Sequence, residues 1–149
     1  MIHEGDQFPK FSLPDQDGKI ITNDDLLGKA TVIYFYPKDD TPGCTKEACE
    51  FRDLAPVNAG VRVVGVSPDS SNSHTKFIQK FELNFTLLAD TDHALAEACG
   101  IWVEKSMYGK SYWGVERTTY LLDENGKVQK VWAKVKPEGH AQEVMAAIG

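Results

Sequence analysis

The chain has few cysteines, no cluster of basic residues and no long apolar run. Its three cysteines are an odd number, and it opens without a basic and apolar leader, which argues against a secreted protein held by structural disulfides. Lys and Arg number 16 against 22 Asp and Glu, so the net charge of −6 argues against binding to nucleic acid or an anionic membrane. The longest mostly apolar run, residues 30–36, is too short to cross a bilayer. We therefore expect a cytoplasmic protein whose cysteines pack, bind metal or carry out redox chemistry.

The composition of the chain is typical of a globular domain. Hydrophobic residues make up 42% and charged residues 26%, which excludes wholesale disorder and fibrous architectures. A chain of this length can bury roughly two thirds of its unfolded surface in one core. No internal repeat, low-complexity tract or linker divides it. We therefore expect a single domain over residues 1–149.

The order of the expected elements predicts an α/β fold. Residues 30–36 are continuously apolar and β-branched or aromatic, which is typical of a strand covered on both faces. A helix over residues 42–55 separates this strand from a second one at 61–67. The other expected elements are an extended piece at 8–13, a helical turn ending at Gly28, a helix at 73–81, a strand at 85–88, a short helix at 93–99, a hairpin of 115–122 with 127–135, and a helix at 137–148. Strands separated by helices, followed by a late hairpin, predict a mixed central sheet flanked by helices.

Cys44 lies where the first buried strand has ended and a helix begins, on the side where open α/β sheets bind ligands. Thr41 is suited to the N-cap of this helix and Pro42 to its first position. Cys44 therefore falls in the first turn, where unpaired backbone N–H groups and the helix dipole favour a thiolate over a thiol. The alternative, an inert packing cysteine, fits poorly with a residue that follows Pro-Gly at a helix start.

The charges beside Cys44 in the sequence do not favour a thiolate. Asp39 and Asp40 oppose an anion unless they turn to solvent. A compensating cation is therefore required, and the neighbouring sequence offers only Lys38 and Lys46.

Cys49 lies five residues after Cys44, and helix geometry limits what the pair can do. In an ideal helix this offset is a rotation of about 140° and a rise of roughly 7.5 Å, which separates the Cα atoms by roughly 8.7 Å. Because a disulfide requires less than about 7 Å, the two residues can bond only if the first turns of the helix unwind. Four intervening residues instead of two disfavour a dithiol oxidoreductase of the thioredoxin type. A zinc site is disfavoured because there is no Cys-x-x-Cys pair and the four histidines are scattered.

The segment around Cys44 resembles a known family. The pattern Pro37-x-x-x-Thr41-x-x-Cys44 matches the active-site signature of the peroxiredoxins. The longer run from residue 36 to Thr45, followed by Cys49, is similar to the bacterioferritin comigratory protein (peroxiredoxin Q) subfamily. The resemblance covers nearly the whole chain, including residues 11–15, 84–88, 109–110 and the strand expected around residue 117. It implies a thioredoxin-like fold and the reduction of hydrogen peroxide and organic hydroperoxides.

The resemblance also implies roles for individual residues, without a metal or a cofactor. Cys44 would be the peroxidatic cysteine, which becomes a sulfenic acid, and Cys49 would resolve it as an intrasubunit disulfide in a monomer. Thioredoxin or a similar dithiol would then reduce the disulfide. The implied supporting residues are Thr41, which would hydrogen-bond the peroxide, Pro37, which would shield the pocket, Arg117, which would supply the missing cation, and Glu47, which would orient that arginine.

Several alternatives stay open at the level of sequence. The same oxidisable cysteine would serve a thiol–disulfide exchange protein, or a redox-sensing or chaperone-like binding protein without peroxide turnover. Cys99 is expected to be a small apolar helix residue, with a spare resolving thiol as the alternative. The aromatic segment is expected to pack in the core and in a hairpin, with partner docking or a place at the pocket rim as the alternative; it comprises Trp102, Tyr108, Tyr112 and Trp113.

Overall fold

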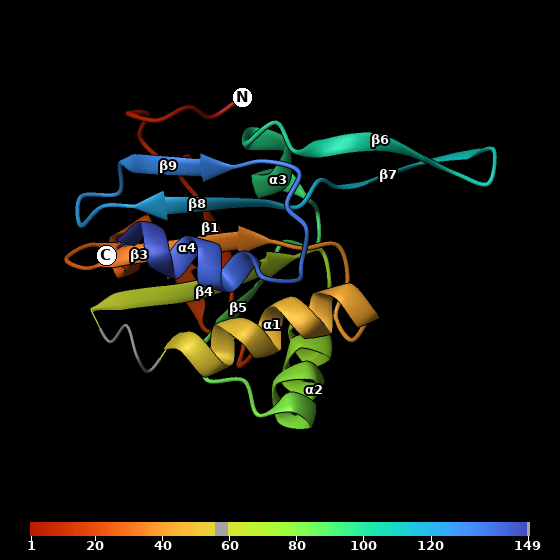
Figure 1. Cartoon of the computed structure of the whole chain (residues 1–149), viewed down its shortest axis with the longest axis horizontal. Helices are drawn as coiled ribbons and strands as arrows, with labels where there is room; N and C mark the ends of the chain where they lie inside the picture. Colours follow the sequence, from red (N-terminus) through yellow and green to blue (C-terminus); the bar gives the residue numbers. More distant parts are fainter. Residues whose placement is uncertain (56–59, 149) are drawn as a thin grey trace.

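A computed structural model describes residues 1–55 and 60–148, and its centre is a five-stranded mixed sheet with the strand order β5-β4-β3-β8-β9 (Figure 1). Within this sheet β3, β4 and β5 are parallel, while β8 runs antiparallel to β3 and β9 antiparallel to β8. These strands are β3 (Ala30–Phe35), β4 (Val61–Ser67), β5 (Thr86–Ala89), β8 (Thr118–Leu122) and β9 (Val128–Trp132). The mixed sheet flanked by helices confirms the predicted fold class. The apolar run before the cysteine segment forms β3, which is buried over all but its first residue.

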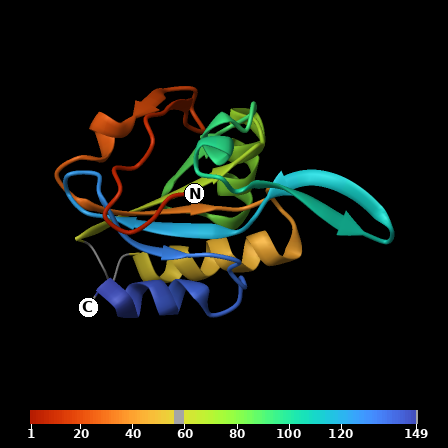
Figure 2. The ribbon, with the colours of Figure 1, turned by 90° about the horizontal axis from the view of Figure 1, so that it is seen from above.

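Helices cover both faces of the sheet. Helices α1 (Pro42–Leu54) and α4 (His140–Ile148) pack together on one face, and Figure 2 shows α3 (Ala94–Ala98) and the N-terminal segment on the other. That segment contains the hairpin of β1 (Ser12–Pro14) and β2 (Ile20–Thr22), followed by the 3₁₀ helix η1 (Asn23–Leu26). Helix α2 (Ser71–Phe81) lies beside β5 at the edge of the sheet. Within the described residues, no helix has the length and apolar character needed to cross a membrane.

A second hairpin projects away from the sheet (Figure 1). It consists of β6 (Trp102–Met107) and β7 (Lys110–Val115), which pair only with each other among the described strands. The aromatic segment forms part of a hairpin, as expected, but three of its members do not pack in the core. Tyr108, Tyr112 and Trp113 are 97%, 43% and 58% exposed, because the hairpin projects beyond the protein core (Figure 1). Trp102, at its base, stacks on the ring of His93 at 4.0 Å.

Several element boundaries differ from the sequence prediction. The strand expected at 115–122 is interrupted, because β7 ends at Val115 and β8 begins at Thr118. The intervening Glu116 donates its backbone N–H to the carbonyl of Ile101 and so still pairs on the side of β6, whereas Thr118 already pairs with β3. Helix α2 begins earlier than expected because Ser70 caps it, and α4 begins later, at residue 140. The break before β8 leaves Arg117 in a connection instead of a strand, which decides where its side chain points.

Candidate active site

The segment between β3 and α1 leads directly into the first turn that carries Cys44. Thr41 occupies the N-cap position with an extended backbone, and Pro42 takes the first helical position, as expected. The hydroxyl of Thr41, however, donates to the carbonyl oxygen of Lys38 at 2.9 Å and does not cap the helix. The prediction was therefore right about the position of Thr41 and wrong about its side chain as a cap. Pro37 is half-buried at the start of the same segment.

Cys44 is 1% exposed, and a guanidinium from a distant part of the chain reaches its sulfur. Arg117 Nη2 donates a hydrogen bond to Cys44 Sγ at 3.0 Å, across 73 positions of sequence. Lys38 and Lys46, the cations nearest in sequence, are both exposed. The guanidinium is permanently charged and planar, so it favours the thiolate and holds it in one direction. Arg117 thus stands where the sequence analysis required a cation.

Glu47 shares this guanidinium with Cys44. Arg117 Nη1 donates to Glu47 Oε1 at 3.0 Å, and the side chain of Glu47 is 1% exposed. Cys44 and Glu47 are three residues apart on α1 and therefore lie on the same face of the helix. Burial raises the pKa of Glu47 to about 7, and the adjacent Arg117 opposes this increase. One guanidinium consequently bridges a buried carboxyl group and the sulfur.

The backbone around Arg117 leaves little space beside the sulfur. The carbonyl oxygen of Arg117 accepts a hydrogen bond from the N–H of Val135 at 3.0 Å, which ties the connection to the segment before α4. A Cβ atom at Gly43 would lie 3.1 Å from Arg117 Nη2 and 3.3 Å from Pro137 Cγ. A side chain at position 43 would therefore require the guanidinium or Pro137 to shift by a few tenths of an ångström. Sequence reasoning did not predict the proximity of Gly43 to Arg117 and Pro137, because it depends on tertiary packing.

The two aspartates before Cys44 differ in their surroundings. Asp40 is exposed and pairs with Lys80 at 2.8 Å, so it satisfies the expectation that it turns to solvent. Asp39 does not turn to solvent. It is buried, and its carboxylate lies 2.7 Å from the ring of His74. Sequence reasoning missed this pair, since a histidine 35 positions away gave no signal of contact.

The three cysteines are free, so the structure is that of the reduced protein. Cys44 and Cys49 lie in one unbroken helix, with Cys49 half-buried. Cys99 is 0% exposed and belongs to the apolar cluster on the opposite face of the sheet from α1. Burial raises the pKa of the Cys99 thiol to about 12, which keeps it protonated at neutral pH. Cys99 is therefore not part of this site.

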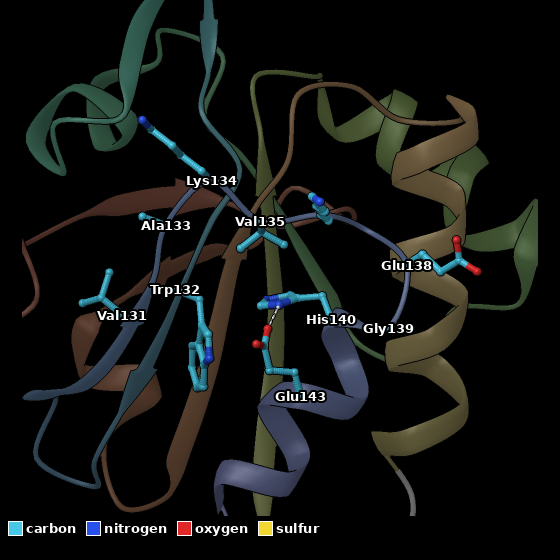
Figure 3. Close-up of a pocket in the computed structure, with 10 residues that line it drawn as sticks. Val131, Trp132, Ala133, Lys134, Val135, Glu138, Gly139, His140 and Glu143 are labelled. Carbon is cyan, nitrogen blue, oxygen red and sulfur yellow. Dashed lines mark hydrogen bonds and ion pairs between the residues drawn. The ribbon is translucent and has the colours of Figure 1, made fainter.

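A surface groove of about 600 Å³ lies between β9 and α4. Figure 3 shows His140 facing Glu143 there, with a hydrogen bond of 3.0 Å between Nδ1 and the carboxylate. The other ring nitrogen of His140 lies 2.7 Å from the hydroxyl of Thr119, and burial lowers the pKa of the imidazole. These contacts hold α4 on the sheet, and no cysteine lines the groove. Among the described residues, no group of three or more potential ligands is arranged to hold a metal ion.

The sequence and the fold of this chain are both similar to those of known proteins. The model of the AhpC/TSA family matches residues 4–131. The chain is 50% identical over 149 residues to a putative peroxiredoxin bcp of Coxiella burnetii, covering 99% of each chain. It is similar to a crystal structure of a Xylella fastidiosa PrxQ mutant, with a TM-score of 0.92, 34% identity and coverage of 99% and 96%. A structure concerned with the alkyl peroxide reduction activity of the Xanthomonas campestris bacterioferritin comigratory protein matches with a TM-score of 0.86, 44% identity and coverage of 93% and 89%.

Proposed function

Because this chain belongs to the AhpC/TSA family and is a thiol peroxidase of the Bcp (peroxiredoxin Q) type, we propose that Cys44 is the thiol that reduces its hydroperoxide substrate. The observation that supports this assignment is the 3.0 Å contact from Arg117 Nη2 to Cys44 Sγ. A buried thiol without a cation would stay protonated, and the thiolate is the nucleophile. The substrates are hydrogen peroxide and small organic hydroperoxides.

The peroxide step follows from the charges at the site. The thiolate of Cys44 attacks one peroxide oxygen, so that an S–O bond forms while the O–O bond breaks. The leaving oxygen takes a proton and departs as water or an alcohol, and the sulfur becomes a sulfenic acid. Arg117 stabilises the thiolate before the attack and the charge that grows on the leaving oxygen during it. Its bond to Glu47 fixes the plane of the guanidinium.

Thr41 and Pro37 border the position of the peroxide. The hydroxyl of Thr41 lies one turn before Cys44 and already makes a hydrogen bond to the Lys38 carbonyl. A hydroxyl has one donor and two acceptor positions, so it can accept from a peroxide O–H while it keeps that bond. Pro37 is half-buried, has no backbone donor and offers only an apolar ring. We assign peroxide orientation to Thr41 and shielding from water to Pro37.

Cys49 is the proposed resolving cysteine. Its thiol condenses with the sulfenic acid to give a disulfide and water. In the intact α1 the two Cα atoms are too far apart for this bond, so the first turns must unwind. The rearrangement breaks both hydrogen bonds of the Arg117 guanidinium, and it breaks the bond from the Thr45 N–H to the Thr41 carbonyl, 2.8 Å long. A dithiol protein such as thioredoxin then reduces the disulfide by thiol–disulfide exchange.

The proposed cycle also bears on the oligomeric state and the compartment of the enzyme. An intrasubunit disulfide needs no cysteine from a second copy, so we propose that residues 1–149 act as one peroxidase unit and as a monomer. Recycling by a dithiol requires a compartment that keeps such reductants reduced, which favours the cytoplasm.

Limiting hydrogen peroxide tests the assignment of the two cysteines. We expect rapid loss of two thiols from the reduced protein and a mass lower by about 2 Da, because two hydrogens leave with the disulfide. Cys49→Ser stops at a sulfenic acid, about 16 Da heavier, and Cys44→Ser loses the rapid phase. Oxidation of the unaltered protein at the rate of a free cysteine contradicts the peroxidase and favours an exchange or binding protein. Full turnover of Cys49→Ser with thioredoxin, together with loss of turnover in Cys99→Ser, overturns the role of Cys49.

A further inference from the structure

A buried carboxylate anchors the segment between β3 and α1, five residues before Cys44. The carboxylate of Asp39 accepts three hydrogen bonds: from the hydroxyl of Tyr36 at 2.5 Å, from the hydroxyl of Ser73 at 2.8 Å and from Nδ1 of His74 at 2.7 Å. Its side chain is 4% exposed and that of His74 is 0% exposed. Two of the three donors belong to α2, so this carboxylate ties the segment to a helix outside the peroxide site.

The anchor extends from Asp39 into the sheet. Nε2 of His74 lies 2.9 Å from the carbonyl oxygen of Leu88 in β5. The backbone N–H of Asp39 donates to Asp69 Oδ2 at 2.8 Å, and the same oxygen accepts from the hydroxyl of Ser67 at the end of β4. The position of Asp39 is therefore fixed by α2 and by two strands, through buried or half-buried contacts.

The geometry also defines the charge of the pair. A carbonyl oxygen only accepts, so Nε2 of His74 carries a proton, and a second proton must lie between Nδ1 and the Asp39 carboxylate. The pair thus holds an imidazolium beside a carboxylate, or the same proton shared between them, and its net charge is zero. This explains how a buried aspartate can precede Cys44 without opposing the thiolate. Removing one partner alone would leave a buried charge unpaired.

We propose that the Asp39–His74 pair is a positioning element for the peroxide step, an inference that rests on the proposed role of Cys44. The pair holds the segment so that Thr41 and the first turn of α1 present the sulfur to Arg117. The other fixed point is Phe51, which is 0% exposed and stacks on Tyr34 at 4.7 Å. Unwinding is then confined to the stretch between residues 39 and 51, which contains both reactive cysteines.

A fixed Asp39 and an unwinding stretch after it predict opposite effects of a mutation on the peroxide step and on the resolving step. Loosening the segment at Asp39 misaligns Cys44 with Arg117, which slows the attack on peroxide. The resolving step needs the first turns of α1 to unwind, so a looser anchor leaves that step unchanged or makes it faster. A merely structural role would lower the stability of the fold without separating the two rates.

Two substitutions of His74 form a matched pair for the test. In His74→Asn the amide nitrogen lies near the place of Nδ1 and keeps the bond to Asp39, whereas in His74→Gln the longer side chain reaches towards Leu88 and loses it. We expect His74→Gln to lower the second-order rate constant for Cys44 oxidation by hydrogen peroxide about tenfold, with an unchanged or faster resolving phase in the same stopped-flow trace. His74→Asn should restore most of the rate.

Controls separate this proposal from stability and from the proposed function. Thr75→Ala removes a bond of 2.7 Å from α2 to the Gln16 carbonyl, which does not touch the segment, and should leave both rates unchanged. If His74→Gln does not fold, Ser73→Ala removes a single donor to the same carboxylate and should slow only the oxidation, by about threefold. Equal rates in these variants and the unaltered protein overturn the anchor, as does a rate in His74→Asn no higher than that in His74→Gln. Slow oxidation of the unaltered protein itself overturns the peroxidase instead.

Discussion

Each outer nitrogen of the Arg117 guanidinium contacts a different partner, Nη1 the carboxyl group of Glu47 and Nη2 the sulfur of Cys44. Lysine carries the same charge on a single atom, so it cannot hold both partners in one plane. We expect Arg117→Lys to lower the second-order rate constant for peroxide about tenfold and Arg117→Met to lower it by a factor of about 10² to 10³. Stopped-flow mixing of the reduced variants with hydrogen peroxide measures both. Arg62→Met is the control, since Arg62 donates a hydrogen bond to the Asp25 carbonyl and not to the site. A rate constant for Arg117→Met within threefold of that of the unaltered protein contradicts the role of Arg117 in the peroxide step.

Glu47 makes the stability of the fold depend on pH. Burial raises its pKa from 4.5 to about 7, so folding favours the protonated carboxyl group. The protonated Glu47 therefore stabilises the folded state fully below about pH 4.5. This contribution to the free energy of unfolding is lost as the pH rises towards 7. Relative to Glu47→Gln, whose side chain does not titrate, the unaltered protein should lose about 3 kcal/mol of unfolding free energy over that interval. Urea denaturation of both proteins at about pH 5 and pH 8 measures the difference; a gap that is constant with pH contradicts it.

The sequence predicted some of these residues and not others, for physical reasons. Cys44 was recognisable because a helix start after a buried strand is a local pattern. Arg117 could be named only from the resemblance, since a contact across 73 positions leaves no periodic signal. The Asp39–His74 pair was not predicted at all. Buried charges with internal partners have the same letters in the sequence as solvated ones, and only the tertiary structure tells them apart.

At the scale of elements, the point where one strand ends and the next begins was also not predictable from local sequence. The sequence of residues 115–122 predicts one strand because apolar and β-branched side chains dominate it. In the structure, Glu116 and Arg117 separate β7 from β8. The β6–β7 hairpin was also not predicted as a projecting element. Its aromatic side chains suggested burial, whereas its two strands pair only with each other among the described strands and leave three of these side chains exposed. The core strands and α1 were predicted well, because burial on both faces and helical spacing are local properties of the sequence.

In the proposed cycle, helix α1 is intact for the peroxide step and unwinds for resolution, so its stability sets the balance between the two. Lys46 is exposed between the two cysteines and contributes no core packing. Lys46→Ala and Lys46→Gly remove the same charge, but their helix propensities differ by about 1 kcal/mol. We expect α1 to unwind about five times less readily in the alanine variant, so its Cys44 should reach the sulfinic acid at a lower peroxide concentration. Intact mass across a peroxide titration measures the species heavier by about 32 Da.

The pair Gln142→Ala and Gln142→Gly is the control for this prediction, because Gln142 is exposed on α4, away from the cysteines. These two variants should accumulate sulfinic acid equally. If the two Lys46 variants also behave alike, unwinding of α1 does not limit resolution.

At the scale of the whole molecule, the sheet separates the thiols into two environments. Cys44 packs with the cluster under α1 and α4, whereas Cys99 packs with the cluster on the other face, beside Tyr120. A disulfide between Cys44 and Cys99 would therefore require the sheet to open, whereas the Cys44–Cys49 bond requires only part of α1 to unwind. The positions of the cysteines relative to the sheet therefore favour Cys49 over Cys99 as the partner of Cys44 in the proposed cycle.

This arrangement predicts that Cys99 stays reduced throughout turnover. Its thiol is fully buried, and burial raises its pKa to about 12, so it is neither accessible nor ionised at neutral pH. After oxidation by hydrogen peroxide, an alkylating reagent should label no thiol in the native protein and one in denaturant. Cys99→Ala should keep the turnover with thioredoxin while lowering the unfolding free energy by about 1 kcal/mol, since a small buried group is lost. A loss of turnover in Cys99→Ala as large as that in Cys49→Ser would mean that the sheet does open during catalysis.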